Sequence, residues 1–312
     1  VLVMISTTTC LFFGAEDSLR TRYPNQIEIS VILPTPGDAS DEAVGKMQAA
    51  VKDVIAAHGA AEKNAAVYRS AYIAGLFKDG VLDTSARPKK GELEDAANML
   101  SVGNLCQAYL IPLSDYNAMA GTNETLAAGE ALVFSIHTRL QSDSLEIAGG
   151  GSYRVHTLDS FPVPGSAAAQ ILPSMFVVVP DFDAIASRLC AKDSTAISLS
   201  WFCGFDTDLD EDAQITLNRE IYYALRDLRE TGALGMGNID CQSAAGERGD
   251  FYGTYGGLFF LGILLSFVFV SAAVLIIYYK QISEGYEDQA RFDIMQKVGM
   301  TRHDIRRSIN AQ

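Results

Sequence analysis

Residues 255–279 read YGGLFFLGILLSFVFVSAAVLIIYY, a run of 25 positions without a charged side chain. At a rise of about 1.5 Å per residue, a helix of this length crosses a hydrocarbon layer of about 30 Å with some tilt. Only the hydroxyls of Ser266 and Ser271 interrupt the apolar run, and a helix in lipid can bond them to its own carbonyls. A buried core helix is the alternative, but it would be shorter and would carry a polar stripe. The run therefore predicts a transmembrane helix.

The N-terminal residues 1–14 are also uncharged, but they are too few for a complete crossing. They lack the basic start and the small-residue cleavage site of a signal peptide, and the chain does not begin with Met. We expect residues 1–15 to be the C-terminal part of a first transmembrane helix, in a chain that is an internal piece of a longer polypeptide. An apolar strand of a soluble domain is the alternative.

The distribution of Lys and Arg predicts the orientation of the chain. Residues 280–312 hold six of them, whereas residues 239–256 hold only Arg248. The positive-inside rule then places residues 280–312 in the cytoplasm and residues 16–254 outside a cell membrane that the chain crosses more than once. The whole chain has 24 basic and 38 acidic residues, and its net charge of −14 argues against nucleic-acid binding, which needs a basic face.

Residues 16–254 carry the mixed patterns of an α+β domain inserted between two transmembrane α-helices. Alternating apolar residues predict a strand at 26–33, and Ser40 is placed to cap a helix that ends at Gly59. The glycine-rich residues 149–152 could form a flexible loop that divides the domain into two lobes. Further strands are expected at 65–77, 107–113, 130–137, 152–158, 174–179 and 195–205, and further helices at 92–100, 182–190 and 212–230.

Sequence patterns for catalysis and metal binding are missing. The chain has no phosphate-binding G-x-x-x-x-G-K-[ST], no G-x-S-x-G, no H-E-x-x-H and no G-x-G-x-x-G. The four histidines are scattered without the spacing of metal ligands. Acidic residues 206–212 lack the Gly and Glu that an EF-hand requires, so an acidic loop before a helix is the simpler interpretation. We therefore expect no enzyme activity, no catalytic residue, no metal and no cofactor.

The disulfide state stays open at the sequence level. Extracellular cysteines can form disulfides, and Cys190 and Cys203 could join the end of a helix to a nearby strand. A domain of this size can also fold without disulfides. The cysteines predicted to lie outside the membrane are Cys106, Cys190, Cys203 and Cys241.

The segment after the uncharged run has a helix–turn–helix pattern. Residues 287–298 place apolar side chains on one helical face, and Gly299 follows as the residue that ends the helix. Thr301 is placed to cap a second short helix, with Asp304 at its third position. We expect this element just below the bilayer, with its apolar stripe covered by a partner. A helix lying on anionic lipid is the alternative.

Residues 292–305 read FDIMQKVGMTRHDI directly after the predicted transmembrane helix. This segment resembles the FtsX-like permease family of ABC transporters. The macrolide-export branch carries an acidic–apolar–Gly triplet where residues 291–293 read RFD, which favours the bacitracin-export type. Residues 112–117, which read PLSDYN, and the later Gly129-Glu130 before a strand are similar to the large ectodomains of such permeases.

The resemblance implies a mechanical function for the cytoplasmic segment. In this family it is the coupling helix, which docks into a separate ABC-type ATP-binding subunit and passes the motion of ATP hydrolysis to the ectodomain. Relatives often handle antimicrobial peptides, and the net charge of −15 over residues 16–250 (18 basic minus 33 acidic) would attract a cationic peptide substrate. An acidic surface that only keeps the domain soluble is the alternative. The implied ATPase contacts are Phe292, Ile294, Met295, Val298, Gly299, Met300 and Thr301.

A membrane sensor with an extracellular ligand-binding domain and a sensor kinase as partner is the second hypothesis. Such a receptor predicts a heptad-patterned helix that continues straight from Tyr279. Gly285 and Gly299 are instead expected to break the cytoplasmic segment into short pieces.

Overall fold

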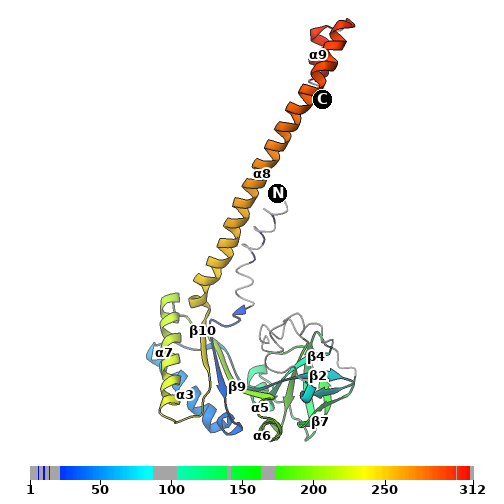
Figure 1. The fold of residues 1–312 in the computed structure, drawn as a ribbon. Coiled ribbons are helices and arrows are strands. Elements are labelled where there is room, and N and C mark those ends of the chain that lie inside the picture. The colour runs from blue at the N-terminus through cyan, green and yellow to red at the C-terminus, as the bar shows by residue number, and fades with distance from the viewer. Residues whose placement is uncertain are drawn as a thin grey trace. The chain divides into compact units, whose positions relative to one another are not determined.

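The computed structural model describes residues 6, 10, 14, 22–86, 104–138, 142–162, 173–299 and 301–309 (Figure 1). The chain divides into two compact units. We call residues 18–249 the sheet unit, and residues 250–312 together with residues 1–17 the helical unit. The elements in chain order are β1 (Ile27–Leu33), η1 (Pro36–Ala39), α3 (Asp41–Ala57), β2 (Lys63–Lys78), β3 (Val81–Asp83), η2 (Thr84–Ala86), β4 (Leu105–Pro112), α5 (Leu113–Ala120), β5 (Glu130–Ile136), β6 (Ser144–Ile147), β7 (Gly151–Thr157), β8 (Ser174–Val179), α6 (Phe182–Lys192), β9 (Ile197–Asp206), α7 (Glu211–Glu230), β10 (Ile239–Ser243), α8 (Ala244–Lys297) and α9 (Arg302–Ile309).

The first lobe of the sheet unit is an antiparallel sheet in the order β10-β1-β9-β2. Alternate residues of β1 are buried, as the strand prediction requires, and they share one hydrophobic cluster with α3 and α7. The side-chain oxygen of Ser40 accepts a hydrogen bond from the Ala43 amide at 3.4 Å, so the predicted cap of α3 is confirmed. An amphipathic helix thus covers the apolar face that the alternation in β1 creates.

The second lobe is a closed ring of strands that shares β2 with the first lobe. Residues 63–73 of β2 pair with β9, and residues 71–76 pair with β4. From β2 the neighbours run β3, β6, β7, β5, β8 and β4, and β4 pairs with β2 again. Gly75 lies where β2 enters the ring. A Cβ there would lie 2.3 Å from the carbonyl oxygen of Asp83, so only glycine allows this close approach.

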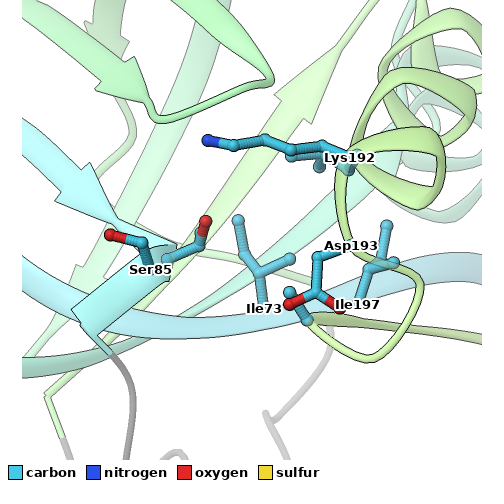
Figure 2. A pocket seen from close by; sticks show the side chains of 8 residues that line it. Ile73, Ser85, Lys192, Asp193 and Ile197 are labelled. Atoms are coloured by element: carbon cyan, nitrogen blue, oxygen red, sulfur yellow. The ribbon is translucent and has the colours of Figure 1, made fainter.

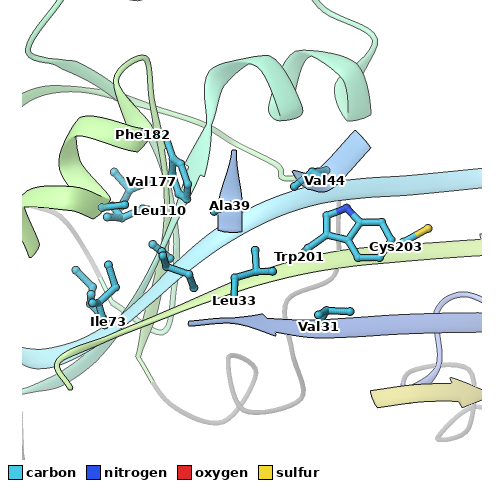
Figure 3. Packing of buried hydrophobic residues seen from close by; sticks show 14 of the residues in the cluster. Val31, Leu33, Ala39, Val44, Ile73, Leu110, Val177, Phe182, Trp201 and Cys203 are labelled. Carbon is cyan, nitrogen blue, oxygen red and sulfur yellow. The ribbon is translucent and has the colours of Figure 1, made fainter. Parts of the chain in front are cut away.

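One hydrophobic cluster extends through both lobes (Figure 3). Leu33 and Trp201 from the first lobe belong to it together with Leu110 and Val177 from the ring. A smaller cluster lies on the opposite faces of β4, β5 and β8, where Tyr116 of α5 packs with their side chains. The sheet unit therefore has a continuous core although its strands form two lobes.

One prediction for this unit is wrong, and another falls on residues that the structure does not describe. Residues 149–152 do not divide the lobes, because they form the turn between β6 and β7, where Ile147 pairs with Gly151. The Gly150 carbonyl accepts hydrogen bonds from Tyr153 at 2.9 Å and from Arg188 at 2.7 Å, so the turn is fixed by tertiary contacts. The helix expected at 92–100 lies outside the described residues.

All five cysteines are free thiols. The pairing of Cys190 with Cys203 is not formed. Cys203 and Cys241 lie on opposite sides of Ile29 in the sheet, so their strands are two spacings, about 9 to 10 Å, apart, which exceeds the reach of a disulfide. The continuous core makes disulfide bonds unnecessary for this fold.

Candidate functional site: the uncharged helix, its extension and a buried arginine

Helix α8 is a single helix of 54 residues that begins directly after β10. Its first turn is capped by Ser243, whose hydroxyl accepts a hydrogen bond from the Gly246 amide at 2.9 Å. The Ala244 amide donates to the Gln26 carbonyl at 2.8 Å. At about 1.5 Å per residue the helix is about 81 Å long, more than twice the length that a membrane crossing needs.

The uncharged part of α8 is the one helix in the described residues that is long and apolar enough to cross a membrane. Only 11 % of its most apolar window is buried within the described residues, whereas the core helix of a soluble protein is mostly buried. Ser266 and Ser271 donate to the carbonyls of Gly262 and Phe267 at 2.8 and 2.9 Å, which confirms the predicted back-bonding. The first transmembrane helix expected at 1–15 lies almost entirely outside the described residues.

The helix continues past the uncharged run, and the predicted break at Gly285 is wrong. α8 extends without interruption to Lys297, which adds about 27 Å to the helix at 1.5 Å per residue. Gly285 lies in its interior, and its missing side chain weakens the helix by only about 1 kcal/mol, too little to end it. We call residues 280–297 the extension. One continuous helix therefore joins the uncharged run to the turn at Gly299.

The turn and the second helix have the predicted local geometry. Gly299 has a φ of +109°, a conformation that strains any residue with a Cβ. The Val298 amide still donates to the Ile294 carbonyl at 3.1 Å, so the helical pattern ends at the turn. The Asp304 amide donates to the Thr301 hydroxyl at 3.4 Å, and that hydroxyl donates to the Asp304 carboxylate. Thr301 is thus the cap of α9.

The residues predicted to contact an ATPase follow one another through the end of α8 and the turn. Ile294 and Val298 are 61 % and 83 % exposed, so this end of the chain presents two branched apolar side chains to solvent. The backbones of Phe292 and Met295 lie in the last turns of α8, and Thr301 precedes α9. Met300 lies outside the described residues.

A buried charge cluster in the sheet unit was not predicted from the sequence. Arg69 of β2 is held by Asp115 of α5, which accepts from the Arg69 amide at 2.8 Å, from Nε at 3.0 Å and from Nη2 at 2.9 Å. Both side chains are largely buried, at 7 % and 15 % exposure. The hydrogen bond with Asp115 raises the pKa of the Arg69 guanidinium, although burial opposes this effect.

The same guanidinium also contacts the first lobe. Its Nη1 atom donates to the Ala39 carbonyl at 3.1 Å and lies 2.8 Å from the Asp41 carboxylate. Asp41 is 90 % exposed, so this second ion pair faces solvent. Arg69 therefore bridges α5 of the second lobe to η1 and α3 of the first.

Residues 112–117, the segment that resembles permease ectodomains, stabilise the local structure of this chain. Asp115 holds Arg69, and Tyr116 lies in the smaller core cluster. The Asn117 amide oxygen accepts from the Glu124 amide at 2.9 Å and from the Thr122 hydroxyl at 3.0 Å, which shapes the loop after α5. These residues fix the junction and its loop, and none of their contacts forms a catalytic arrangement.

The described residues contain no group of three or more His, Cys, Asp or Glu side chains that could hold a metal. A small cavity of about 140 Å³ lies between β2, η2, the end of α6 and the start of β9 (Figure 2). Its lining is mostly apolar, with Ile73, Leu189 and Ile197, and the Lys192 ammonium donates to the Ala148 carbonyl at 3.3 Å. The cavity offers little space for a ligand.

A search against protein-family models gives no match for this chain, and a search of curated proteins gives none either. The resemblance to FtsX-like permeases therefore rests on sequence patterns alone, chiefly those of the C-terminal residues and of residues 105–135.

Proposed function

We propose that this chain is part of the membrane-spanning permease of an ABC transporter, bacitracin-export type. Residues 255–279 then cross the cell membrane, residues 1–15 end an earlier crossing, residues 16–254 lie outside, and residues 280–312 lie in the cytoplasm. ATP is hydrolysed by a separate ATP-binding subunit, and this chain passes the motion to its α+β domain. Export of or resistance to a cationic antimicrobial peptide is the transport task that fits the acidic domain.

The exposed apolar end of α8 supports this proposal most directly. Ile294 and Val298 expose branched side chains to solvent, and the left-handed turn at Gly299 redirects the chain into α9. A protein groove that buried these side chains would remove apolar surface from water, which is the usual basis for docking a helix. The extension places them about 22 to 28 Å from the uncharged run, at about 1.5 Å per residue along the helix, which favours a protein partner over a lipid surface.

One observation supports the sensor hypothesis, because α8 continues from Tyr279 to Lys297 without a break. A dimeric signalling helix would also need apolar residues at heptad positions. Counting heptads from Ile282, Gly285, Gln289 and Gln296 occupy positions that should be apolar. The continuous helix therefore lacks the pattern of a coiled coil, and the permease remains the preferred function.

The test is co-purification of the parent permease with the ATP-binding subunit encoded beside it. Gly299→Val forces a β-branched side chain into a positive-φ turn, and Val298→Asp places a charge on the apolar contact. Both variants should lose the ATPase while they remain in the membrane. Gly285→Val is the matched control, because it makes the same substitution in the helix interior, where the new Cβ would meet nothing within 4 Å apart from the backbone of the helix itself.

Retention of the ATPase by Gly299→Val and Val298→Asp would refute the coupling contact. If the unmodified protein captures no ATPase, the permease function fails. Capture of a histidine kinase by the same tail would then favour the sensor.

A further inference from the structure

One face of α8 is covered, although the uncharged run is otherwise exposed. Among residues 258–275 only Gly262 and Ser266 are buried, and they lie four positions apart on one side of the helix. The half-buried side chains of Tyr255 and Phe259 continue the same side toward the start of the run. We call these four residues the covered face.

A comparison with Ser271 shows that α8 itself does not bury Ser266. Both hydroxyls donate to the carbonyl four residues earlier, at 2.8 and 2.9 Å, so their settings within the helix are alike. Ser266 is 4 % exposed, whereas Ser271 is exposed. The large side chains of Phe267 and Leu275 lie one turn on either side of Ser271, and even they do not cover it. A second segment of the chain therefore lies against Ser266.

Residues 1–17 are the segment that can cover this face. They form one compact unit with residues 250–312. The extension begins about 21 Å beyond Ser266 along the helix, and α9 lies farther still, so neither covers it. Within residues 1–17, Ser6 and Cys10 are helical, and the Gly14 amide donates to the Cys10 carbonyl at 2.8 Å.

The length and chemistry of this segment suit the covered face. Residues 1–14 carry no charge, so they can lie beside α8 in the same apolar layer. As a helix they would be about 20 Å long, enough for the roughly 17 Å between Tyr255 and Ser266. Gly262 and Ser266 have the spacing of the small-residue motif that lets two membrane helices approach closely.

We propose that residues 1–15 pack as a helix against the covered face of α8, with Gly262 and Ser266 at the point of closest approach. The two helices run in opposite directions, because residues 16–254, which link them, lie on one side of the membrane in the proposed function. The contact itself is the same in a permease and in a sensor, so failure to capture an ATPase leaves it standing.

Phe259 and Phe267 provide matched positions for the test. Phe259 belongs to the covered face, whereas Phe267 is 74 % exposed on the same helix. The photoreactive amino acid p-benzoylphenylalanine replaces one of them at a time in the full chain, which is irradiated in its membrane and mapped by mass spectrometry. Position 259 should form a cross-link to a peptide that contains residues 1–15, and position 267 should not.

Two serine variants then test the point of closest approach. Ser266→Leu places a large side chain there and should cause loss of the cross-link from position 259. Ser271→Leu makes the same change on the exposed part of the helix and should leave the cross-link unchanged. Equal cross-linking in the two variants would refute close approach at Ser266.

The cross-linked product itself decides which segment covers the face. Absence of residues 1–15 from the product at position 259, or equal yields from positions 259 and 267, would overturn the packing. A cross-linked dimer on a denaturing gel, in place of the cross-link within one chain, would also overturn it, because a second copy would then cover the face.

Discussion

The carboxylate of Asp115 stabilises the contact between α5 and β2. It accepts three hydrogen bonds from Arg69 and is only 15 % exposed, so its loss would leave a cation without its main partner in a buried site. We expect Asp115→Asn to lower the free energy of unfolding by about 3 kcal/mol, the usual result of breaking a buried pair. Urea unfolding followed by Trp201 fluorescence measures this change.

Asp53→Asn serves as the control for that substitution, because Asp53 is an exposed carboxylate on α3. It should change the free energy of unfolding by less than about 0.5 kcal/mol. If Asp115→Asn and Asp53→Asn changed the free energy of unfolding equally, the hydrogen bonds between Arg69 and Asp115 would not stabilise the fold.

The cysteines give a second prediction at the residue scale. Burial raises the pKa of Cys106, Cys203 and Cys241 to about 12, so almost no thiolate is present at neutral pH. In a Cys10→Ser background, a disulfide reagent at pH 7.5 should modify the half-buried Cys190 first. The buried Cys106 and Cys203 should react only after unfolding. Rapid reaction of all four in the native protein would show that the core is open.

Arg69 could have been noticed in the sequence but its partner could not. Arg69 is the only charged residue in the stretch 64–77. The alternation of a strand places it on the same apolar face as Val67 and Ala71. A lone charge on a buried face indicates a pair. The partner Asp115 lies 46 positions away on a different element, and the pairing of β2 with β4 that brings it close is set by tertiary structure.

At the scale of elements, periodicity predicted long segments and failed for short ones. β1, α3, α6 and α7 appear where alternation and helical stripes placed them. β3, β6 and β10 are too short for a repeating pattern, and the helix α5 was not predicted. The closed ring depends on pairings between distant strands, which no local pattern contains. The turn at Gly299 and the cap at Thr301 were predictable because both are local.

The extension of α8 is the element whose continuity matters most for the proposed function. A proline at position 285 removes a helical hydrogen bond and costs about 3 kcal/mol, whereas an alanine there favours the helix by about 0.5 to 1 kcal/mol. Hydrogen exchange of residues 280–297 should therefore become faster in Gly285→Pro and slower in Gly285→Ala. Unchanged exchange in Gly285→Pro would show that no continuous helix passes this position.

At the scale of the whole molecule, the proposed function puts residues 16–254 outside the cell and residues 280–312 in the cytoplasm. Asn123 is exposed in the loop after α5, and Val298 is exposed at the end of α8. In a Cys10→Ser, Cys190→Ser background, a membrane-impermeant maleimide should label Asn123→Cys in intact cells. It should label Val298→Cys only after the cells are permeabilised. Labelling of both without permeabilisation would place the two residues on one side and contradict the crossing.

The pairing of Ile73 with Ile197 has a consequence for how the fold can be divided. The ring leaves and rejoins the first lobe at adjacent positions, as an inserted domain does when it is spliced into a surface turn. A short hairpin turn between these two positions would leave β1, α3, the first part of β2, β9, α7 and β10 as a smaller α/β sandwich with its strand order intact. The ring is thus, by topology, a single insertion into the first lobe, and the strand β10 that leads into α8 pairs with β1 alone and does not depend on it.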